Sequence, residues 1–209
     1  MSNSMEHFNG DQLAVIDIET TGLDAYWHEI IQIAILPLDS NLKPRKDVLP
    51  FYLEMMPSNP ERIDEEAMKV NKLKLANVIL RGHDPEKVKD LLEEWFFKLK
   101  LPLTKYGKSK RLVPLGQNYT FDKDFITHWL GINVYQEYFH HNYRDTMIAA
   151  NYINDQAAMH AEKIPFSKVN LSWLAKELRV ERPVVHDALQ DCIITAEVYR
   201  CLLQRGLMV

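Results

Sequence analysis

Apolar residues gather in three short runs near the start of the chain. The largely apolar run Gln12–Ile18 leads into a polar turn that contains Gly22, which predicts a buried strand and its exit. The runs Ile30–Leu38 and Val48–Met55 predict two further strands, joined by the polar turn NLKPRKD. Three strands so closely spaced indicate an antiparallel meander.

Helical spacing replaces this pattern after residue 64. The segment Asp64–Glu66 opens a short helical stretch, and the pair Asp84-Pro85 predicts the N-terminus of a longer helix. Apolar positions of that longer helix recur at helical spacing: Val88, Leu91, Leu92, Trp95, Phe96 and Leu99. Further strands are expected at Leu112–Leu115 and Tyr143–Asp145, and further helices at Phe121–Leu130, Thr146–Glu162, Leu171–Leu178 and Ala188–Leu203. This order predicts an α/β fold whose mixed sheet, an antiparallel meander plus parallel strands, is flanked by helices.

Chain length and composition favour one globular domain. With 209 residues, 46% of them hydrophobic, the chain can build one well-buried core and is short for two. We expect a flexible N-terminus at residues 1–11 and a single domain at residues 12–209. The net charge of -4 gives no sign of a generic nucleic-acid binder. It does not exclude a nuclease, because bound divalent cations would neutralise several carboxylates.

The N-terminal segment and the cysteines bear on the expected compartment. No stretch approaches the roughly 18 apolar residues of a membrane span, and the polar start MSNSMEHFNG lacks the apolar core of a secretory signal. Cys192 and Cys201 lie nine positions apart in one predicted helix, too far for a disulfide across it. We therefore expect free thiols and a cytoplasmic protein.

Two carboxylates stand at the end of the first predicted strand. Asp17 and Glu19 are two positions apart, so their side chains leave the same face. An isolated pair of this kind is also typical of a strand with one solvated face. Here, however, the run Leu13–Ile16 indicates a central strand covered on both faces, where adjacent carboxylates would repel unless a cation lay between them. Hard cations such as Mg²⁺ or Mn²⁺ suit such oxygen ligands.

A third carboxylate, Asp122, lies on the apolar stripe of its predicted helix. Phe125, Ile126 and Trp129 follow it by three, four and seven positions, whereas Asp124 falls on the polar side. This spacing predicts that Asp122 points inward. The alternative is a helix-capping role near the N-terminus.

The segment from His186 to Asp191 has the pattern of a helix start. If Asp187 is the N-cap and Gln190 the third helical residue, His186 and Asp191 occupy the two positions that meet across the entry turn. An imidazole opposite a carboxylate at a helix N-terminus can act as an acid-base group. A histidine before a helix can equally be structural.

Together the segments DIETTGL (17–23), NYTFD (118–122) and HDALQD (186–191) resemble the three signature motifs of the DEDDh 3′–5′ exonuclease superfamily. The resemblance spans the whole chain, and the three motifs are specific in combination. It implies a ribonuclease H-like fold, similar to proofreading exonucleases, RNase T and oligoribonuclease. It also implies two divalent ions, Mg²⁺ or Mn²⁺, held by Asp17, Glu19, Asp122 and Asp191, with His186 as general base.

The same resemblance implies where substrate binds. The residues expected to contact the terminal nucleotide are Thr20, Thr21, Gly22, Leu23, Asn118, Tyr119 and Phe121. Among them, Thr21 is expected at the 3′-hydroxyl and Leu23 against the bases. Tyr119 departs from the small residue that many members carry, and it would narrow the site or offer a stacking surface.

The substrate is expected to be single-stranded or frayed nucleic acid with a free 3′ end. DNA is slightly favoured over RNA, because no residue identifies a reader of the 2′-hydroxyl. A non-catalytic nucleic-acid-binding module on the same fold is the alternative of another class. The basic run from Lys105 to Arg111 is either a solvated loop or a phosphate contact. A homodimer stays open, because the apolar residues of the final helix are more often core than interface.

Overall fold

A five-stranded mixed sheet forms the centre of the molecule. The computed structural model describes residues 11–71, 73–181 and 187–206, so nearly all of the expected flexible N-terminus lies outside the described residues. The strands are β1 (Gln12–Thr20), β2 (Ile30–Pro37), β3 (Phe51–Glu54), β4 (Leu112–Gly116) and β5 (Arg144–Asp145), in the order β3-β2-β1-β4-β5. β1, β2 and β3 pair antiparallel, whereas β4 and β5 run parallel to β1. The predicted meander and the predicted mixed sheet are both confirmed.

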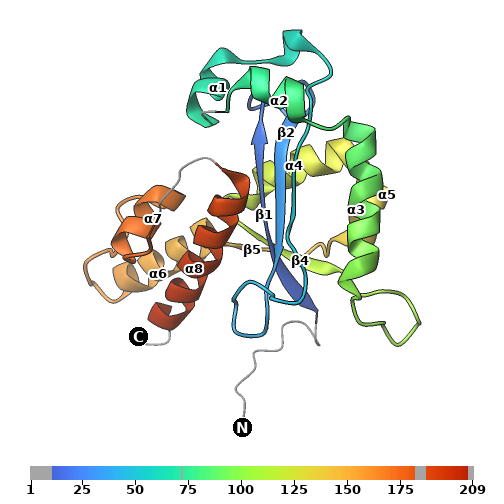
Figure 1. Cartoon of the computed structure of the whole chain (residues 1–209). Coiled ribbons are helices and arrows are strands. Elements are labelled where there is room, and N and C mark those ends of the chain that lie inside the picture. The colour runs from blue at the N-terminus through green and yellow to red at the C-terminus, as the bar shows by residue number, and fades with distance from the viewer. Residues whose placement is uncertain (1–10, 72, 182–186, 207–209) are drawn as a thin grey trace.

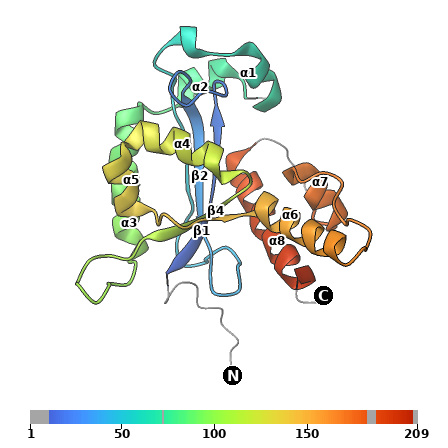
Figure 2. The same ribbon diagram turned by 180° about the vertical axis from the view of Figure 1, so that it is seen from behind.

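Helices cover both faces of this sheet (Figures 1 and 2). The helices of the described residues are η1 (Pro60–Arg62), α1 (Glu65–Asn71), α2 (Leu75–Arg81), α3 (Pro85–Leu99), α4 (Tyr119–Leu130), α5 (Ile132–Tyr138), α6 (Thr146–Met159), α7 (Leu171–Glu177) and α8 (Ala188–Gly206). α3, α4 and α5 lie on one side of the sheet, and α6, α7 and α8 on the other. α1 and α2 lie beyond the end of β1 at which the strand's arrowhead points.

The alternation of side chains along β1 decides which helices it packs against. Ala14, Ile16 and Ile18 belong to the core cluster shared with α3, α4 and α5. Leu13 and Val15 belong to the cluster shared with α8. Because successive side chains point to opposite faces, every second residue of β1 faces α8.

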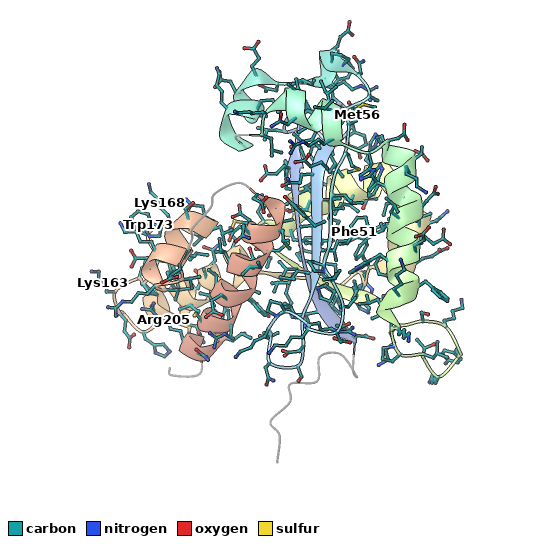
Figure 3. The ribbon with its side chains drawn as sticks, viewed as in Figure 1. Phe51, Met56, Lys163, Lys168, Trp173 and Arg205 are labelled. Carbon is teal, nitrogen blue, oxygen red and sulfur yellow. The ribbon has the colours of Figure 1, made fainter. Side chains whose placement is uncertain are left out.

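Aromatic packing holds α3 against the antiparallel edge of the sheet. Phe51 on β3 points toward α3 (Figure 3), and its ring centroid lies 5.8 Å from that of Trp95. The Trp95 indole N–H donates to the carbonyl of Leu49 at 2.8 Å. The predicted N-cap of α3 is confirmed, because the Asp84 side chain accepts a hydrogen bond from the backbone N–H of Glu86.

The final helix packs inward, as its apolar residues predict. Tyr199 and Leu202 on α8 are buried in the core. Among the described residues, no helix is both long and apolar enough to cross a membrane.

Candidate active site

The two carboxylates of β1 lie on the face of the sheet that α8 covers. Asp17 and Glu19 continue the alternation of Leu13 and Val15, whose side chains pack against α8. Both sit near the end of the strand, where β1 leaves the sheet. The Cα of Glu19 pairs with that of Gln32 on β2, and the register shifts directly after this pair.

α8 brings a third carboxylate to the same point. Asp191 lies in the first turn of α8 and is 5% exposed. One carboxylate oxygen from each of Asp17, Glu19 and Asp191 lies within 4.8 Å of the others. Three carboxylates this close would repel one another in the absence of a counter-charge. Their hard oxygen donors fit a divalent cation such as Mg²⁺ or Mn²⁺, so the residues present suit the metals that the sequence implies.

Asp122 approaches from the opposite side of the sheet, on α4. Its side chain is buried, as are Phe125 and Ile126 on the same stripe, while Asp124 is exposed. The inward orientation predicted from the helical spacing is therefore confirmed. Asp122 Oδ1 accepts a hydrogen bond of 3.1 Å from the backbone N–H of Ile18, the residue between the two β1 carboxylates.

Burial has a marked effect on the ionisation of Asp122. Loss of solvent raises the pKa of this carboxyl well above its usual value, and the nearby Asp145 carboxylate adds to the rise. Hydrogen bonds from its own backbone amide and from that of Ile18 oppose the shift. A cation beside Asp122 would favour the ionised form, so the environment of this carboxyl is suited to a charged partner.

The start of α8 is fixed by a network of partly buried polar side chains. Asp187 Oδ1 accepts from the backbone N–H of Gln190 at 3.0 Å, which confirms the predicted capping pattern. Asp187 Oδ2 accepts from the hydroxyl of Tyr52 on β3 at 2.6 Å. Gln32 on β2 donates to the Tyr52 hydroxyl at 3.1 Å and accepts from the N–H of Ala188 at 2.8 Å. This network fixes the helix that carries Asp191. His186 precedes it and lies outside the described residues.

The loop that follows β1 is closed by hydrogen bonds between Thr21 and Glu29. Thr21 N donates to the Glu29 carbonyl, and Glu29 N donates to the Thr21 hydroxyl, each at 2.9 Å. Thr21 is fully buried, so its hydroxyl is committed to the loop. Thr20 Oγ1 donates to the Gly22 carbonyl at 2.6 Å. A Cβ added at Gly22 would lie 2.1 Å from the ring of His28, so any larger residue here would force this ring or the loop to move.

A pocket of about 300 Å³ opens beside the β1 carboxylates. It is lined by Ile18, Glu19, Thr20, Leu23, Asp64, Glu66, Ala67 and Phe121. Leu23 is 79% exposed and stands at the edge of the pocket. Apolar and aromatic walls next to a carboxylate cluster suit a nucleobase held beside a phosphate.

The remaining predicted substrate residues lie at the N-terminus of α4. Asn118 is exposed and adopts a left-handed conformation with φ of 59° as the N-cap of this helix. Tyr119, in contrast, is fully buried, and its hydroxyl lies 2.9 Å from that of Tyr135. The structure therefore does not bear out a stacking surface at Tyr119. Its bulk fills the core next to Gly116, where an added Cβ would lie 2.9 Å from Tyr119.

Sequence reasoning missed the role of Asp145, which it took only as the end of a short strand. Asp145 is 5% exposed and accepts backbone hydrogen bonds from Asn118, Tyr119, Met147 and Ile148. It therefore ties the start of α4 to the start of α6. An Asp directly before a predicted helix is an N-cap signal, but its second pair of donors comes from a distant part of the chain.

The basic run from Lys105 to Arg111 lies at the other end of β1. Leu112, directly after the run, pairs with Gln12 at the start of β1, whereas the carboxylates stand near its end. Arg111 Nη1 donates to the Gln136 carbonyl at 3.0 Å, and Lys110 pairs with Asp11 at 3.8 Å. Within one copy of the chain, these cations do not line the pocket at the carboxylates.

The sequence of the chain was compared with protein families and with known proteins. The exonuclease family model named for RNase T matches residues 14–199. The chain is 26% identical over 208 residues to the ribonuclease T of Actinobacillus pleuropneumoniae serotype 5b (strain L20), covering 95% of this chain and 86% of that protein. The matched residues include both β1 carboxylates, Asp122 and Asp191.

Solved structures share the fold. E. coli exonuclease I in complex with a dA16 oligonucleotide superposes with a TM-score of 0.72 at 18% identity, over 95% of this chain and 42% of that one. Cell-death related nuclease 4 gives a TM-score of 0.70 at 16% identity, over 94% of this chain and 64% of that one. The chain thus spans less than two thirds of these proteins' lengths. The ribonuclease H-like fold is confirmed, and the chain belongs to the exonuclease family.

Proposed function

We propose that this protein is a metal-dependent 3′–5′ exonuclease that hydrolyses phosphodiester bonds from the 3′ end of single-stranded or frayed nucleic acid and releases nucleoside monophosphates. The observation that carries the proposal is the convergence of Asp17, Glu19 and Asp191 within 4.8 Å beside an apolar pocket. Two cations held there and by Asp122 would activate water on one side of the phosphorus and stabilise the leaving oxygen on the other.

The chain's own residues would divide the remaining tasks. Leu23 and Phe121 line the pocket and would hold the terminal base, while the turn from Thr20 to Gly22 and the exposed Asn118 would contact its sugar and phosphate. Thr21 is fully buried and its hydroxyl accepts from Glu29 N, so it would act on the 3′-hydroxyl indirectly, by holding this turn in place. His186 would remove the proton from the attacking water. Tyr119 would act indirectly, by supporting the start of α4 from the core.

DNA remains the slightly favoured substrate, with exoribonuclease trimming of RNA as the second candidate. Exonuclease I, which shares the fold, is described in complex with a DNA oligonucleotide, whereas the relative that matches by sequence is called a ribonuclease. We place the activity in the cytoplasm, in keeping with the free thiols of Cys192 and Cys201. A homodimer is compatible with this scheme.

The test uses matched DNA and RNA 12-mers, each labelled at either the 3′ or the 5′ end, with Mg²⁺ or Mn²⁺. We expect labelled mononucleotide to be released at once from the 3′-labelled strand, and a ladder of shortened products from the 5′-labelled one. Preferential loss of the DNA strand supports the favoured substrate, and preferential loss of RNA supports the alternative. Mononucleotide released first from the 5′ label would overturn the polarity. Binding without turnover in either metal would indicate a non-catalytic module.

A further inference from the structure

The loop from Gly22 to His28 separates the pocket at the carboxylates from a second pocket. Leu23 lines the first pocket, whereas Ala25 and His28 line the second. α4 forms another shared wall, because Phe121 faces the first pocket and Phe125, about one turn further along, faces the second. The two pockets are therefore neighbours on opposite sides of one closed loop.

The second pocket is rich in hydrogen-bond donors. It has a volume of about 120 Å³, and four of its lining residues carry donor nitrogens: His28, Arg62, His128 and Trp129. Nε of Arg62 and Nε1 of Trp129 are shielded from solvent and have no hydrogen-bond partner among the described residues. Arg62 lines the pocket and carries further guanidinium donors, so a ligand that supplies oxygen acceptors would be stabilised here.

Among the described residues that line this pocket, the single carboxylate is already engaged. Glu29 accepts hydrogen bonds from the backbone N–H and the hydroxyl of Ser58 and from the N–H of Asn59. Arg62 forms no ion pair with any acidic residue in the described part of the chain. No free carboxylate among the described lining residues therefore competes for Arg62, and the pocket suits an anion of the size of a phosphate group.

Two exposed aromatic rings stand on the same loop. Tyr26 is 81% exposed and Trp27 is 48% exposed. The Arg62 guanidinium lies over the Trp27 ring at 5.4 Å from its centroid, and the Tyr26 ring meets His128 edge-on at 5.3 Å. Exposed aromatic rings beside a guanidinium are typical of single-strand binding without sequence preference, because every base has a face that can stack.

We propose that this second pocket, with the Tyr26 and Trp27 rings, is an auxiliary nucleotide site for single-stranded nucleic acid. The Arg62 guanidinium binds one phosphate of the strand, and the exposed rings stack an adjacent base. The site rests on the proposed nuclease function, yet it takes no part in bond cleavage. It raises the affinity for strands long enough to reach past Leu23, and it does not change the affinity for a dinucleotide.

The experiment measures binding of a fluorescein-labelled DNA 12-mer by anisotropy in EDTA, which prevents cleavage. The variants are Tyr26→Ala, Trp27→Ala and Arg62→Met. Phe97→Ala is the matched control, since this aromatic side chain is 87% exposed on α3. Loss of one stacked base predicts a Kd about 5- to 150-fold higher for Tyr26→Ala or Trp27→Ala, and Arg62→Met should weaken binding at low salt more than at high salt. Phe97→Ala should bind like wild type.

Steady-state kinetics in Mg²⁺ then separate this site from the catalytic one. For the 12-mer we expect a raised KM and an unchanged kcat in the three variants, while turnover of a dinucleotide stays at the wild-type rate. Unchanged 12-mer binding by all three variants, with normal cleavage by wild type, overturns the auxiliary site alone. The auxiliary site is also overturned if Arg62→Met weakens binding of a free nucleoside monophosphate but leaves the Kd of the 12-mer unchanged. No cleavage by wild type defeats the proposed function instead.

Discussion

The backbone N–H of Ile18 on β1 donates to the Asp122 carboxylate on α4 at 3.1 Å, joining residues 104 positions apart. Ile18 lies between the two carboxylates of β1, and its own side chain faces the core on the α4 side. The hydrogen bond therefore fixes the fourth carboxylate against the strand that carries the first two. It also means that Asp122 enters the site from the face opposite to α8.

Replacing Asp122 should make the metal-free protein more stable at neutral pH. Burial raises the folded-state pKa of Asp122 above its unfolded value of about 3.9. Protonation of such a group stabilises the folded state most at a pH below the unfolded pKa. This stabilisation is lost as the pH rises through the folded-state pKa. Asp122→Asn keeps an acceptor for Ile18 and removes the buried charge. In EDTA we expect a gain of about 1–3 kcal/mol at pH 8 and little at pH 4.

Thermal unfolding of both proteins in EDTA across this pH range checks the point. The same Asp122→Asn variant should lose nuclease activity and gain less from added Mn²⁺ than wild type. Equal stability of the two proteins at pH 8 would contradict the conclusion that burial destabilises the ionised form of Asp122.

Removing the Tyr52 hydroxyl should loosen the start of α8. Tyr52 donates to Asp187 at 2.6 Å, and burial followed by the Asp187 carboxylate raises the pKa of Tyr52 above its ordinary value. The phenol therefore remains a donor throughout the working pH range. Tyr52→Phe should cost about 1.5–3 kcal/mol, as expected for a hydrogen bond to a charged group.

Urea unfolding measures that loss, and kinetics give a second readout. If the network positions Asp191, Tyr52→Phe lowers kcat more than it raises KM, and higher Mn²⁺ partly restores kcat. A stability loss with unchanged kcat would limit Tyr52 to a structural role.

The close contact between Gly22 and His28 predicts a coupled pair of substitutions. A Cβ at residue 22 would lie 2.1 Å from the His28 ring, so Gly22→Ala forces this ring or the loop to move. The displaced ring would also lose the hydrogen bond that His28 Nδ1 accepts from Asp24 N at 3.1 Å. We expect a loss of about 1–3 kcal/mol.

His28→Ala removes the clashing ring, so Gly22→Ala should cost much less in that background. A double-mutant cycle of melting temperatures measures this coupling. Additive effects of the two substitutions would mean that the His28 ring is not what excludes a side chain at residue 22.

His186 gives a prediction that depends on the sequence motif. If His186 is the general base, His186→Ala should lower kcat about 10²–10⁴-fold. The stabilisation of the fold against heat by bound metal should remain. The acidic limb of the pH–rate profile should disappear once the imidazole is removed. An unchanged profile in His186→Ala would return the residue to a structural role.

Local patterns predicted those parts of the fold that depend on neighbours in sequence. The alternation along β1, the N-cap at Asp84 and the inward Asp122 each follow from spacing within one element. α5 was not predicted, because Ile132 and Val134 resemble a strand more than a helix and both remain well exposed.

Long-range contacts explain what the sequence could not supply. Tyr52 and Asp187 are 135 positions apart, so no periodicity links their side chains. Tyr119 was expected at the substrate because of its place in the NYTFD motif, whereas its burial involves Tyr135 on the unpredicted helix α5. Sequence spacing could identify the carboxylates of the site, but only the packing of α8 on β1 shows that three of them converge.

The most direct test of the account is the single-turnover release of mononucleotide from a 3′-labelled DNA 12-mer in Mg²⁺, compared between wild type and Asp17→Asn. We expect rapid release by wild type, abolished by EDTA. For Asp17→Asn we expect a rate at least about 10³-fold lower, because loss of a metal's contribution to transition-state charge stabilisation is worth several kcal/mol. A folded Asp17→Asn protein that releases mononucleotide as fast as wild type would contradict it.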